Sequence, residues 1–562
     1  MFDTHFHDAV VAAATRRAAV LLARGGPTIS AQSHRELMRD AKVLLSLVAS
    51  GDVSEQERGR YLAAAIERVE LLRARQSRSG LFAGGDNLES PPDSAFTVND
   101  VCDTYEFLHS NGPRNELDDI LDVLAAIIRD GTPPLLTGGV HTPNHRWEIS
   151  AALARIHRSF SDRRLIERAN EWLDEGVDVD PDGLYSERSP NYAAHVSNPS
   201  LTLLAEVLDR PDLADVVLRN LEATLTLIRP DDTVETVQSR RQDQAAHFPL
   251  RDYLAAFRDA AIRSGRGDFA AAARRAEGDG VTDPELLAET LLNPRLLEPL
   301  PAARKNEMGS YFLEAVALAG RRSERTETVL YGGSDYGTQG CIRSGLANNP
   351  TFCRLFAGAA ILDSVRLSRS FFDLGPFRAQ GMRRLKDDSY LLEETLTAAY
   401  YQPLAAEDRA AAGGYRLEDE GRFSASMAFS VRGRDQVSMT TRIGARLLDD
   451  GLILEVSIDS PELPWSIEFG FREGGVLEGG ERRADDTWVL PEGRGRYRVG
   501  ADAISIEVDG PQLSSDPLPY QPGQDYAFLG GTDAVGGIRA RVGGIAPAAF
   551  TVRLLAESGT AQ

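Results

Sequence analysis

The sequence predicts an α+β protein of more than one domain, in which a helical part, residues 1–300, precedes an antiparallel β-sandwich, residues 301–562. Three observations lead to this prediction. The chain has 562 residues, more than one hydrophobic core usually organises. Apolar residues recur with helical spacing up to about Leu292, whereas short strand-like stretches between Gly-rich turns follow Pro301. The Pro-rich segment 291–305 therefore places the domain boundary near Leu300.

The helical part contains long amphipathic segments joined by polar turns and by loops rich in Gly, Pro and Asn. We expect helices over residues 33–49, 54–76, 99–110, 115–129, 145–160, 162–175, 198–208, 211–226 and 242–264. Helices of this length without intervening strands indicate antiparallel hairpins, arranged as a bundle, a solenoid or a closed α/α toroid. The absence of a fixed sequence period disfavours the solenoid.

The second part shows the alternating pattern of short strands. We expect strands over residues 311–319, 326–331, 351–356, 422–430, 436–442, 452–457, 465–471, 497–499, 503–508 and 550–554. Because no helical segment separates these stretches, the pattern is typical of an antiparallel sandwich rather than of a parallel sheet.

Composition excludes several classes of partner. A formal net charge of -22 argues against nucleic acid and against an anionic membrane surface. No apolar run approaches the ~20 residues of a membrane span, and the first residues lack the basic start of a signal peptide. Three scattered cysteines indicate a reducing compartment, so we expect a cytoplasmic protein. No motif for a metal or another cofactor is recognisable, and the sequence leaves a homo-oligomer open.

Chemistry-bearing residues concentrate first in residues 137–156, TGGVHTPNHRWEISAALARI. Asn144 and His145 adjoin, and Glu148 follows three residues later, where a helix would let its carboxylate reach the imidazole and select the protonated nitrogen. This arrangement is typical of an oriented general base. A helix-capping amide and a buried, hydrogen-bonded histidine explain the same residues. Trp147 is either a core residue or a platform for a sugar ring.

A second run, residues 182–201, brings Tyr192, Arg188 and His195 close together in sequence. A phenol with an ordinary pKa near 10 needs a cation beside it to act as a base near neutral pH, and Arg188 is four residues away. Amide, imidazole, phenol and guanidinium together indicate proton transfer on an anionic substrate. The alternatives are a core tyrosine, a structural His195 and an ion pair between Glu187 and Arg188.

Other stretches contribute candidates for substrate binding. The polar segment 80–108 is long enough for a functional loop, and residues 235–248 place arginines at an expected helix start, where they can bind a carboxylate. From the second part, the segment 332–345 contributes further candidates. These residues are Asn87, Asn99, Tyr105, Arg240, Arg241, Tyr336 and Arg343. A helix cap at Asn99 and a solvated helix face at the arginines are the alternatives.

The order of parts and both runs resemble the heparinase II/III-like polysaccharide lyases. The resemblance rests on Asn144, His145 and Glu148 in NHRWE, on Tyr192 in YSERSPNY, and on residues 345–372. It implies an α/α toroid that carries the catalytic residues, followed by a β-sandwich. Members of this group often carry a further histidine, and in several a zinc site, in the sandwich. Because no histidine follows His247, a base or a zinc site of that kind is excluded here.

The resemblance also implies β-elimination at a 4-linked uronic acid, in a polysaccharide or oligosaccharide. Asn144 would neutralise the C6 carboxylate, His145 or Tyr192 would remove the C5 proton, and Tyr192 would protonate the leaving O4. Two rivals stay open. A toroid glycoside hydrolase would need two carboxylates, for which Asp93, Glu148 and Glu187 are candidates. A protein that binds carbohydrate without catalysis is the other.

Overall fold

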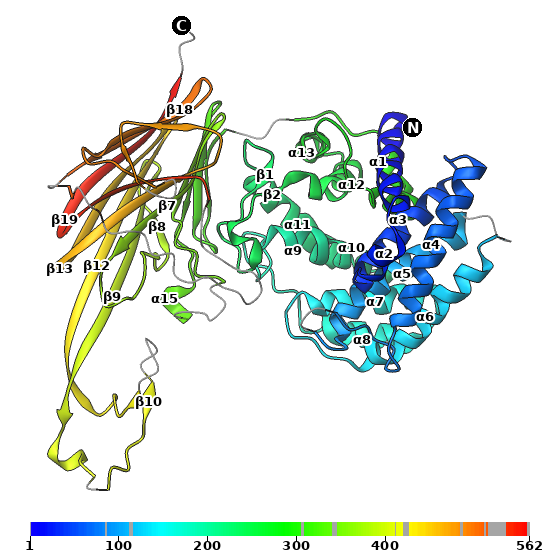
Figure 1. Ribbon diagram of the computed structural model, residues 1–562, viewed down its shortest axis with the longest axis horizontal. Coiled ribbons are helices and arrows are strands. Elements are labelled where there is room, and N and C mark those ends of the chain that lie inside the picture. Colours follow the sequence, from blue (N-terminus) through cyan, green and yellow to red (C-terminus); the bar gives the residue numbers. More distant parts are fainter. Residues whose placement is uncertain are drawn as a thin grey trace. The chain divides into compact units, whose positions relative to one another are not determined.

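The computed structural model describes all residues except 1, 85–86, 112–115, 305–307, 340–345, 411, 420–425, 484–486, 511–512, 515–516, 518–535 and 559–562 (Figure 1). The chain divides into two compact units. One is Met1–Glu235 with His247–Glu307, and the other is Thr236–Ala246 with Met308–Gln562. The first unit is helical and the second is built of strands, which is the fold class expected from the sequence. A short internal segment of the chain, residues 236–246, belongs to the second unit, which the sequence did not indicate.

The helical unit is a series of antiparallel hairpins. Its helices are α1 (Thr4–Leu22), α2 (Gly26–Ser30), α3 (His34–Ser50), α4 (Glu55–Arg75), α5 (Pro91–Asn111), α6 (Asp118–Thr137), α7 (His145–Phe160), α8 (Arg163–Leu173), α9 (Pro190–Tyr192), α10 (Asn198–Val207), α11 (Pro211–Leu227), α12 (Leu254–Ser264), α13 (Gly267–Glu277) and α14 (Leu286–Leu292). The hairpins are α3 with α4, α5 with α6, α7 with α8, α10 with α11, and α12 with α13. Successive first helices also contact one another, so α3, α5, α7 and α10 form an inner row.

The helices of the inner row are parallel, and ion pairs between them show their register. Arg35 pairs with Asp93 and Lys42 with Asp100, both 58 residues apart, which aligns α3 with α5. Two further pairs, each 52 residues apart, align α5 with α7: Arg155 with Asp103 and Arg158 with Glu106. A constant offset requires the two helices to run in the same direction. The first turns of the inner helices therefore lie together at one end of the unit.

Local sequence signals explain where most of these helices begin. Ser33 and Glu36 form a capping box at α3, as Ser54 and Glu57 do at α4, and each box satisfies two backbone N–H groups. The expected range 145–160 is confirmed for α7. In contrast, α5 begins at Pro91 rather than at residue 99, because Pro91 and Pro92 occupy its first turn, where proline costs no backbone hydrogen bond.

The expected helix over residues 242–264 is wrong in its first half. Residues Gln242–Ala245 form a 3₁₀ turn, Phe248–Pro249 is the short strand β2, paired with β1 (Thr233–Val234), and a second 3₁₀ turn, Leu250–Tyr253, precedes α12. Pro249 has no N–H to continue a helix. In addition, the Asn349 amide donates to the carbonyls of Val237 and Gln244 and holds segment 236–246 in a non-helical path within the second unit.

The second unit is a β-sandwich. Its strands are β3 (Gly309–Leu313), β4 (Leu318–Arg322), β5 (Thr326–Tyr331), β6 (Cys353–Ala357), β7 (Ala360–Arg369), β8 (Met382–Arg384), β9 (Ser389–Leu404), β10 (Glu418–Asp419), β11 (Ser426–Met427), β12 (Arg432–Leu448), β13 (Gly451–Phe471), β14 (Val476–Glu478), β15 (Glu481–Arg482), β16 (Thr487–Val489), β17 (Arg494–Val499), β18 (Asp502–Asp509) and β19 (Ile538–Ser558). The short helix α15 spans Tyr336–Gln339. Among these strands β16 pairs parallel with β19, whereas the other pairs are antiparallel. The expected strand over residues 311–319 is two strands, because a turn with Ala317 at φ 50° separates β3 from β4.

Two long strands, β13 and β19, connect the layers of this sandwich. Their register shifts between Ile458 and Leu463. Before the shift, residues 451–459 of β13 pair with β12, and after it residues 465–471 pair with β7. Because β7 also lies against β17 and β18 without pairing, the sheet folds over at the shift into two facing layers. Trp465 stacks on Phe550 at 4.2 Å between ring centroids in the core between them.

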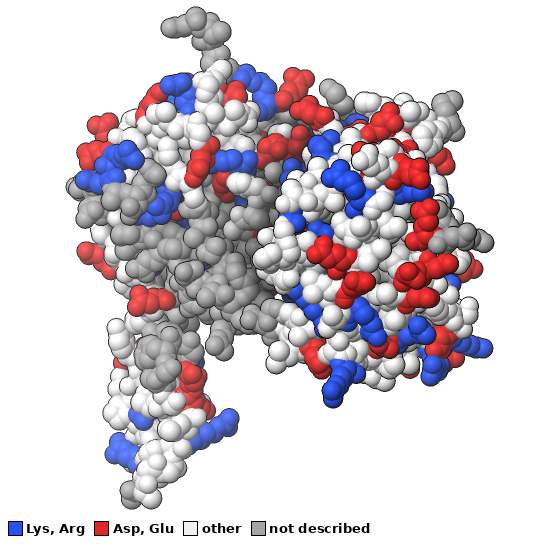
Figure 2. All heavy atoms as spheres, turned by 45° about the vertical axis from the view of Figure 1, so that its right-hand side comes forward, with Lys and Arg blue, Asp and Glu red and all other residues white. Residues whose placement is uncertain are grey.

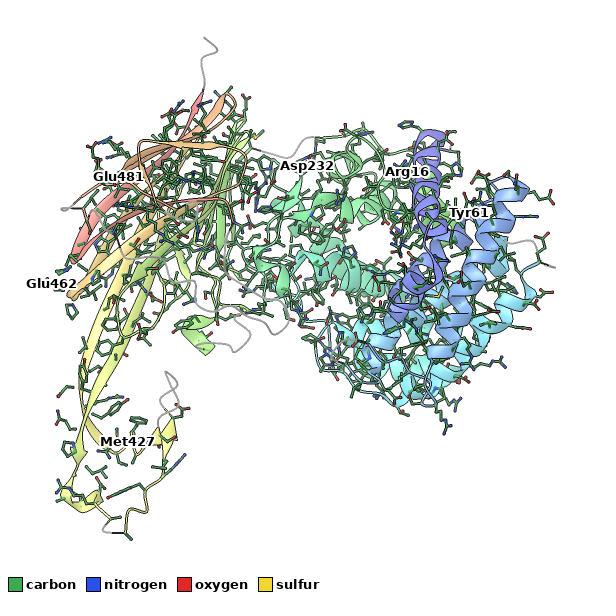
Figure 3. The ribbon with its side chains drawn as sticks, viewed as in Figure 1. Arg16, Tyr61, Asp232, Met427, Glu462 and Glu481 are labelled. Carbon is green, nitrogen blue, oxygen red and sulfur yellow. The ribbon has the colours of Figure 1, made fainter. Side chains whose placement is uncertain are left out.

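The hairpin of β9 and β12 extends beyond the sandwich as a long arm, and Met427 of β11 lies on it (Figures 1 and 3). The expected strand over residues 422–430 overlaps this arm, but residues 420–425 lie outside the described part of the chain. Among the helices that the structure describes, none combines the length and the apolarity needed to cross a membrane.

Candidate active site

Most of the chemistry-bearing residues of the helical unit lie at the end where the inner helices begin. Asn144 and His145 stand at the start of α7, and Tyr192 ends the short α9, just before α10. The segment that joins α9 to α10 also contacts α7. Arg35 of α3 interacts electrostatically with both Glu148 and Tyr192, which brings four helical segments into one neighbourhood.

Asn144 is held in one orientation but leaves a donor unused. It is 2% exposed, and its Oδ1 accepts a hydrogen bond of 2.6 Å from the Thr142 hydroxyl. Its side chain makes no capping hydrogen bond to α7, so the alternative of a capping amide is wrong. Within the described part of the chain, its buried Nδ2 has no hydrogen-bond partner. A buried amide N–H in that state costs free energy, so a ligand that accepts from it is favoured.

His145 lies against two aromatic rings. Its centroid is 6.2 Å from that of Phe96 and 4.7 Å from that of His141, both in edge-on geometry. The sequence analysis did not single out His141, which is exposed and lies four residues before His145. These contacts place the His145 ring between Phe96 and His141 at the start of α7.

Glu148 has different partners from those expected. It accepts a hydrogen bond of 2.6 Å from Asn99 Nδ2 on one carboxylate oxygen and one of 3.3 Å from the Ser200 hydroxyl on the other. The expected contact with the His145 imidazole is therefore replaced by a link from α7 to α5 and α10. Burial raises the pKa of Glu148 to about 7, and the Asn99 hydrogen bond opposes this rise.

This raised pKa predicts a pH-dependent stability. The folded protein favours protonated Glu148. The contribution of Glu148 to the free energy of unfolding is therefore fully present below its ordinary pKa of 4.5 and is lost as the pH rises through about 7. The difference corresponds to about 3 kcal/mol. We expect the unfolding free energy of Glu148→Gln, relative to that of the wild type, to rise by about 3 kcal/mol between pH 4.5 and about pH 8. Urea unfolding at the two pH values measures this change. A gain that is the same at both pH values would show that Glu148 does not titrate in this range.

Tyr192 is positioned by an unusual backbone. Ser189 caps α9 by accepting a hydrogen bond of 3.1 Å from the Tyr192 N–H, and a π-helical turn, Ala193–Ser197, follows directly. Such turns interrupt regular helices and are frequent at functional sites. Arg188 has a left-handed φ of 52°, which is uncommon for a residue with a side chain. The expected pairing of Arg188 with Tyr192 stays a prediction.

Arg35 is a site residue that sequence reasoning missed. Its guanidinium is paired with Asp93 and lies 4.0 Å above the centre of the Phe96 ring, which in turn contacts His145. The Ser33 capping box marks a helix start next to Arg35, but no sequence signal relates this helix to α7. Its partner Asp93 is one of the carboxylates that the sequence offers for a hydrolase.

Three substrate-binding candidates have structural partners, and binding of substrate by them stays a prediction. Trp147 is 2% exposed and its ring is covered by Arg146, so it is a core residue. Asn99 lies inside α5 and does not cap a helix, and its amide hydrogen-bonds to Glu148 and Arg155. Tyr105 contacts Phe160 at the far end of α7, about 22 Å along the helix from His145.

The remaining candidates of the helical unit stay predictions. Asn87 is exposed and forms a backbone bridge with Gly84, beside the ring of His34. His195 is half-exposed, and its Nε2 lies 3.4 Å from a carboxylate oxygen of Asp252.

The candidates of the second unit have structural partners. Arg240 donates to both carboxylate oxygens of Asp335 at 2.7 and 2.8 Å, and it does not start a helix. Arg241 precedes a 3₁₀ turn and is half-buried. The Tyr336 hydroxyl donates to the Leu374 carbonyl at 3.1 Å. Arg343 lies outside the described residues. Binding of substrate by these residues stays a prediction.

Charges on the helical unit are mixed. Figure 2 shows acidic and basic side chains intermingled on the face of this unit that is turned forward. Among the described residues, no group of three or more histidine, cysteine, aspartate or glutamate side chains could hold a metal ion.

No protein-family model matches the sequence, and no curated protein matches it either. The structure is similar to that of a chondroitin AC lyase from Streptomyces coelicolor A3, with a TM-score of 0.51, 14% identity, and coverage of 98% of this chain and 77% of that one. The chain has the fold of a polysaccharide lyase. A heparinase III has a TM-score of 0.51 at 10% identity, with 92% and 77% coverage. A xanthan lyase from Paenibacillus has a TM-score of 0.52 at 9% identity, with 100% and 57% coverage.

The lyase fold agrees with the resemblance drawn from the two sequence runs. These neighbours combine a helical toroid with a β-domain, which is the order of parts in this chain. At identities of 9–14% the likeness concerns the fold, and substrate and residue roles require their own argument.

Proposed function

We propose that the protein is a lyase that cleaves 4-linked uronic acid glycosides by β-elimination, in an oligosaccharide or polysaccharide. The observation that supports this most is the buried Asn144 amide, whose Nδ2 has no hydrogen-bond partner among the described residues and which adjoins His145. Arg35 links Tyr192 to the same neighbourhood. The charge of Arg35 interacts with Tyr192, and its guanidinium lies over the ring of Phe96, which packs against His145. An amide donor, an imidazole and a phenol are groups that an elimination at a uronate can use.

Each group has a defined task in the proposed reaction. The Asn144 N–H donates to the C6 carboxylate, on which negative charge develops as the C5 proton leaves. His145 or Tyr192 takes that proton, and the electron pair forms the C4–C5 double bond. The C4–O4 bond breaks, and Tyr192 returns a proton to the departing O4. The products are an unsaturated uronate and a new sugar hydroxyl.

The geometry supports elimination over hydrolysis. A glycoside hydrolase needs two carboxylates flanking the bond. Glu148 is 5% exposed and its oxygens are bound to Asn99 and Ser200, while Asp93 is paired with Arg35. The partners of these two carboxylates, and the burial of Glu187 as the third candidate, disfavour a hydrolytic pair, whereas the Asn144 Nδ2 has no hydrogen-bond partner within the described residues.

A substrate panel with two readouts tests this function. The protein is incubated with oligosaccharides of glucuronate, mannuronate, guluronate and galacturonate, and both ultraviolet absorbance and new reducing ends are measured. We expect absorbance from the C4–C5 double bond to rise in proportion to the reducing ends for at least one substrate. Reducing ends without absorbance would indicate hydrolysis, and no turnover of any uronate would favour a non-catalytic carbohydrate-binding protein.

We further propose that the substrates are short oligosaccharides rather than densely sulfated polymers. The net charge of -22 repels a polyanion outside a local basic site. Cys102 and Cys353 are buried free thiols, which is compatible with the cytoplasmic location that we expect.

A further inference from the structure

The proposed elimination needs more positive charge than Asn144 supplies. When the C5 proton leaves, the C6 carboxylate takes up a second negative charge, and preorganised positive charge nearby lowers that barrier. An amide N–H contributes only a dipole. Arg155, whose charge also acts on Glu148, is engaged by Asp103 and Asn99.

Arg35 has the position and the free donors to meet this need. Its guanidinium donates one hydrogen bond to the Asp93 carboxylate, and the ring of Phe96 covers one face of the guanidinium plane. Among the described residues no further group accepts from Arg35, and its side chain is 32% exposed, so other N–H groups point to solvent. An arginine held in this way is suited to bind a carboxylate bidentately.

Arg35 carries a positive charge at this end of α3, whereas its neighbour His34 does not. The neighbouring His34 is buried and bonded to the Thr97 hydroxyl at 2.7 Å, and burial lowers the pKa of His34 to about 4, so its ring is neutral. The Arg35 charge interacts with Glu148, which lies one turn after His145 in α7, and with Tyr192, the last residue of α9.

We propose that the Arg35 guanidinium, together with the Asn144 amide, binds the carboxylate of the uronate ring at which cleavage occurs. This inference rests on the proposed function and adds a binding residue from α3, far in sequence from both runs that carry the chemistry. It makes the free carboxylate itself, rather than the sugar ring alone, the feature that the site recognises. A neutral ester of the same sugar would lack this interaction.

Selectivity between a uronate and its methyl ester tests the proposal. In the wild type we expect kcat/KM for the free uronate to exceed that for the ester by about 10- to 100-fold, as a bidentate charged contact provides. Arg35→Gln should reduce this ratio to about 1 to 3, by losing activity on the uronate while retaining it on the ester. Arg35→Lys, which keeps the charge without the bidentate geometry, should give an intermediate ratio.

Arg39→Gln is the matched control, because it removes the same side chain one turn further along α3, where Arg39 faces Glu285. It should leave the ratio unchanged. A ratio in Arg35→Gln equal to that of the wild type would overturn the proposal. Since Arg35→Gln leaves Asp93 without its partner, the double variant Arg35→Gln/Asp93→Asn, checked by thermal melting, separates loss of folding from loss of recognition.

A binding experiment separates this proposal from the proposed function. Calorimetry on Tyr192→Phe compares each of the four tetra-uronates with a neutral tetrasaccharide, with and without Arg35→Gln. We expect uronate affinity to fall at least tenfold with Arg35→Gln while neutral-sugar affinity is unchanged. If the wild type cleaves no uronate but this difference in affinity is found, the proposed elimination is overturned while the proposed carboxylate site at Arg35 is supported. Equal affinities, or no binding of any uronate, overturn the Arg35 site.

Discussion

Tyr192→Phe is expected to lower kcat by about 10² to 10⁴-fold on the uronate identified by the panel, with a much smaller change in KM. The substitution removes one hydroxyl from a partly exposed ring and retains the Ser189 cap, which binds the backbone N–H rather than the side chain. The phenol is the group that we propose to protonate O4, so the loss falls on the chemical step. Steady-state kinetics by ultraviolet absorbance provide the measurement.

Tyr185→Phe is the matched control for this prediction. Tyr185 lies in the same run, but it is 8% exposed and its hydroxyl donates to Asn198 at 2.7 Å. Burial raises the pKa of Tyr185, which makes this phenol unsuitable for proton transfer near neutral pH. We expect Tyr185→Phe to cost about 1 kcal/mol of unfolding free energy and to leave kcat unchanged. Equal activity of the two variants would remove Tyr192 from the mechanism.

Asn144→Ala is expected to lower kcat by about 10² to 10³-fold, because it removes a donor aimed at the charge that develops on the carboxylate. The stability of the protein should change little. Asn144 makes no capping bond, and its buried Nδ2 has no partner among the described residues, so the folded state loses only the bond from Thr142. Loss of activity without loss of stability is the signature that distinguishes a functional amide from a structural one.

Thr142→Val provides a graded test of the same idea. The Thr142 hydroxyl donates to Asn144 Oδ1 and thereby orients Nδ2. Without that bond the amide can rotate, so we expect a smaller loss of kcat than in Asn144→Ala, and no further loss when both changes are combined. A strong fall in melting temperature in Asn144→Ala, with activity retained at low temperature, would instead assign Asn144 a structural role.

Several features of this protein followed from the sequence alone. Periodicity and capping residues are local, so they predicted the change from helices to strands and the bounds of α7. The amide and the imidazole at the start of α7 were also recognisable, because Asn144 and His145 adjoin in sequence, and the phenol of Tyr192 was recognisable from the polar run that surrounds it.

The tertiary structure decided which side chains meet. The register between parallel inner helices, with offsets of 58 and 52 residues, brings Asn99 to Glu148 and Arg35 to the ring that packs on His145. Helical periodicity predicts the face that a helix buries, but it does not specify how far one helix is shifted along the next. For that reason the partner of Glu148, the burial of Trp147 and the place of Arg35 beside Tyr192 could be found only in the folded chain.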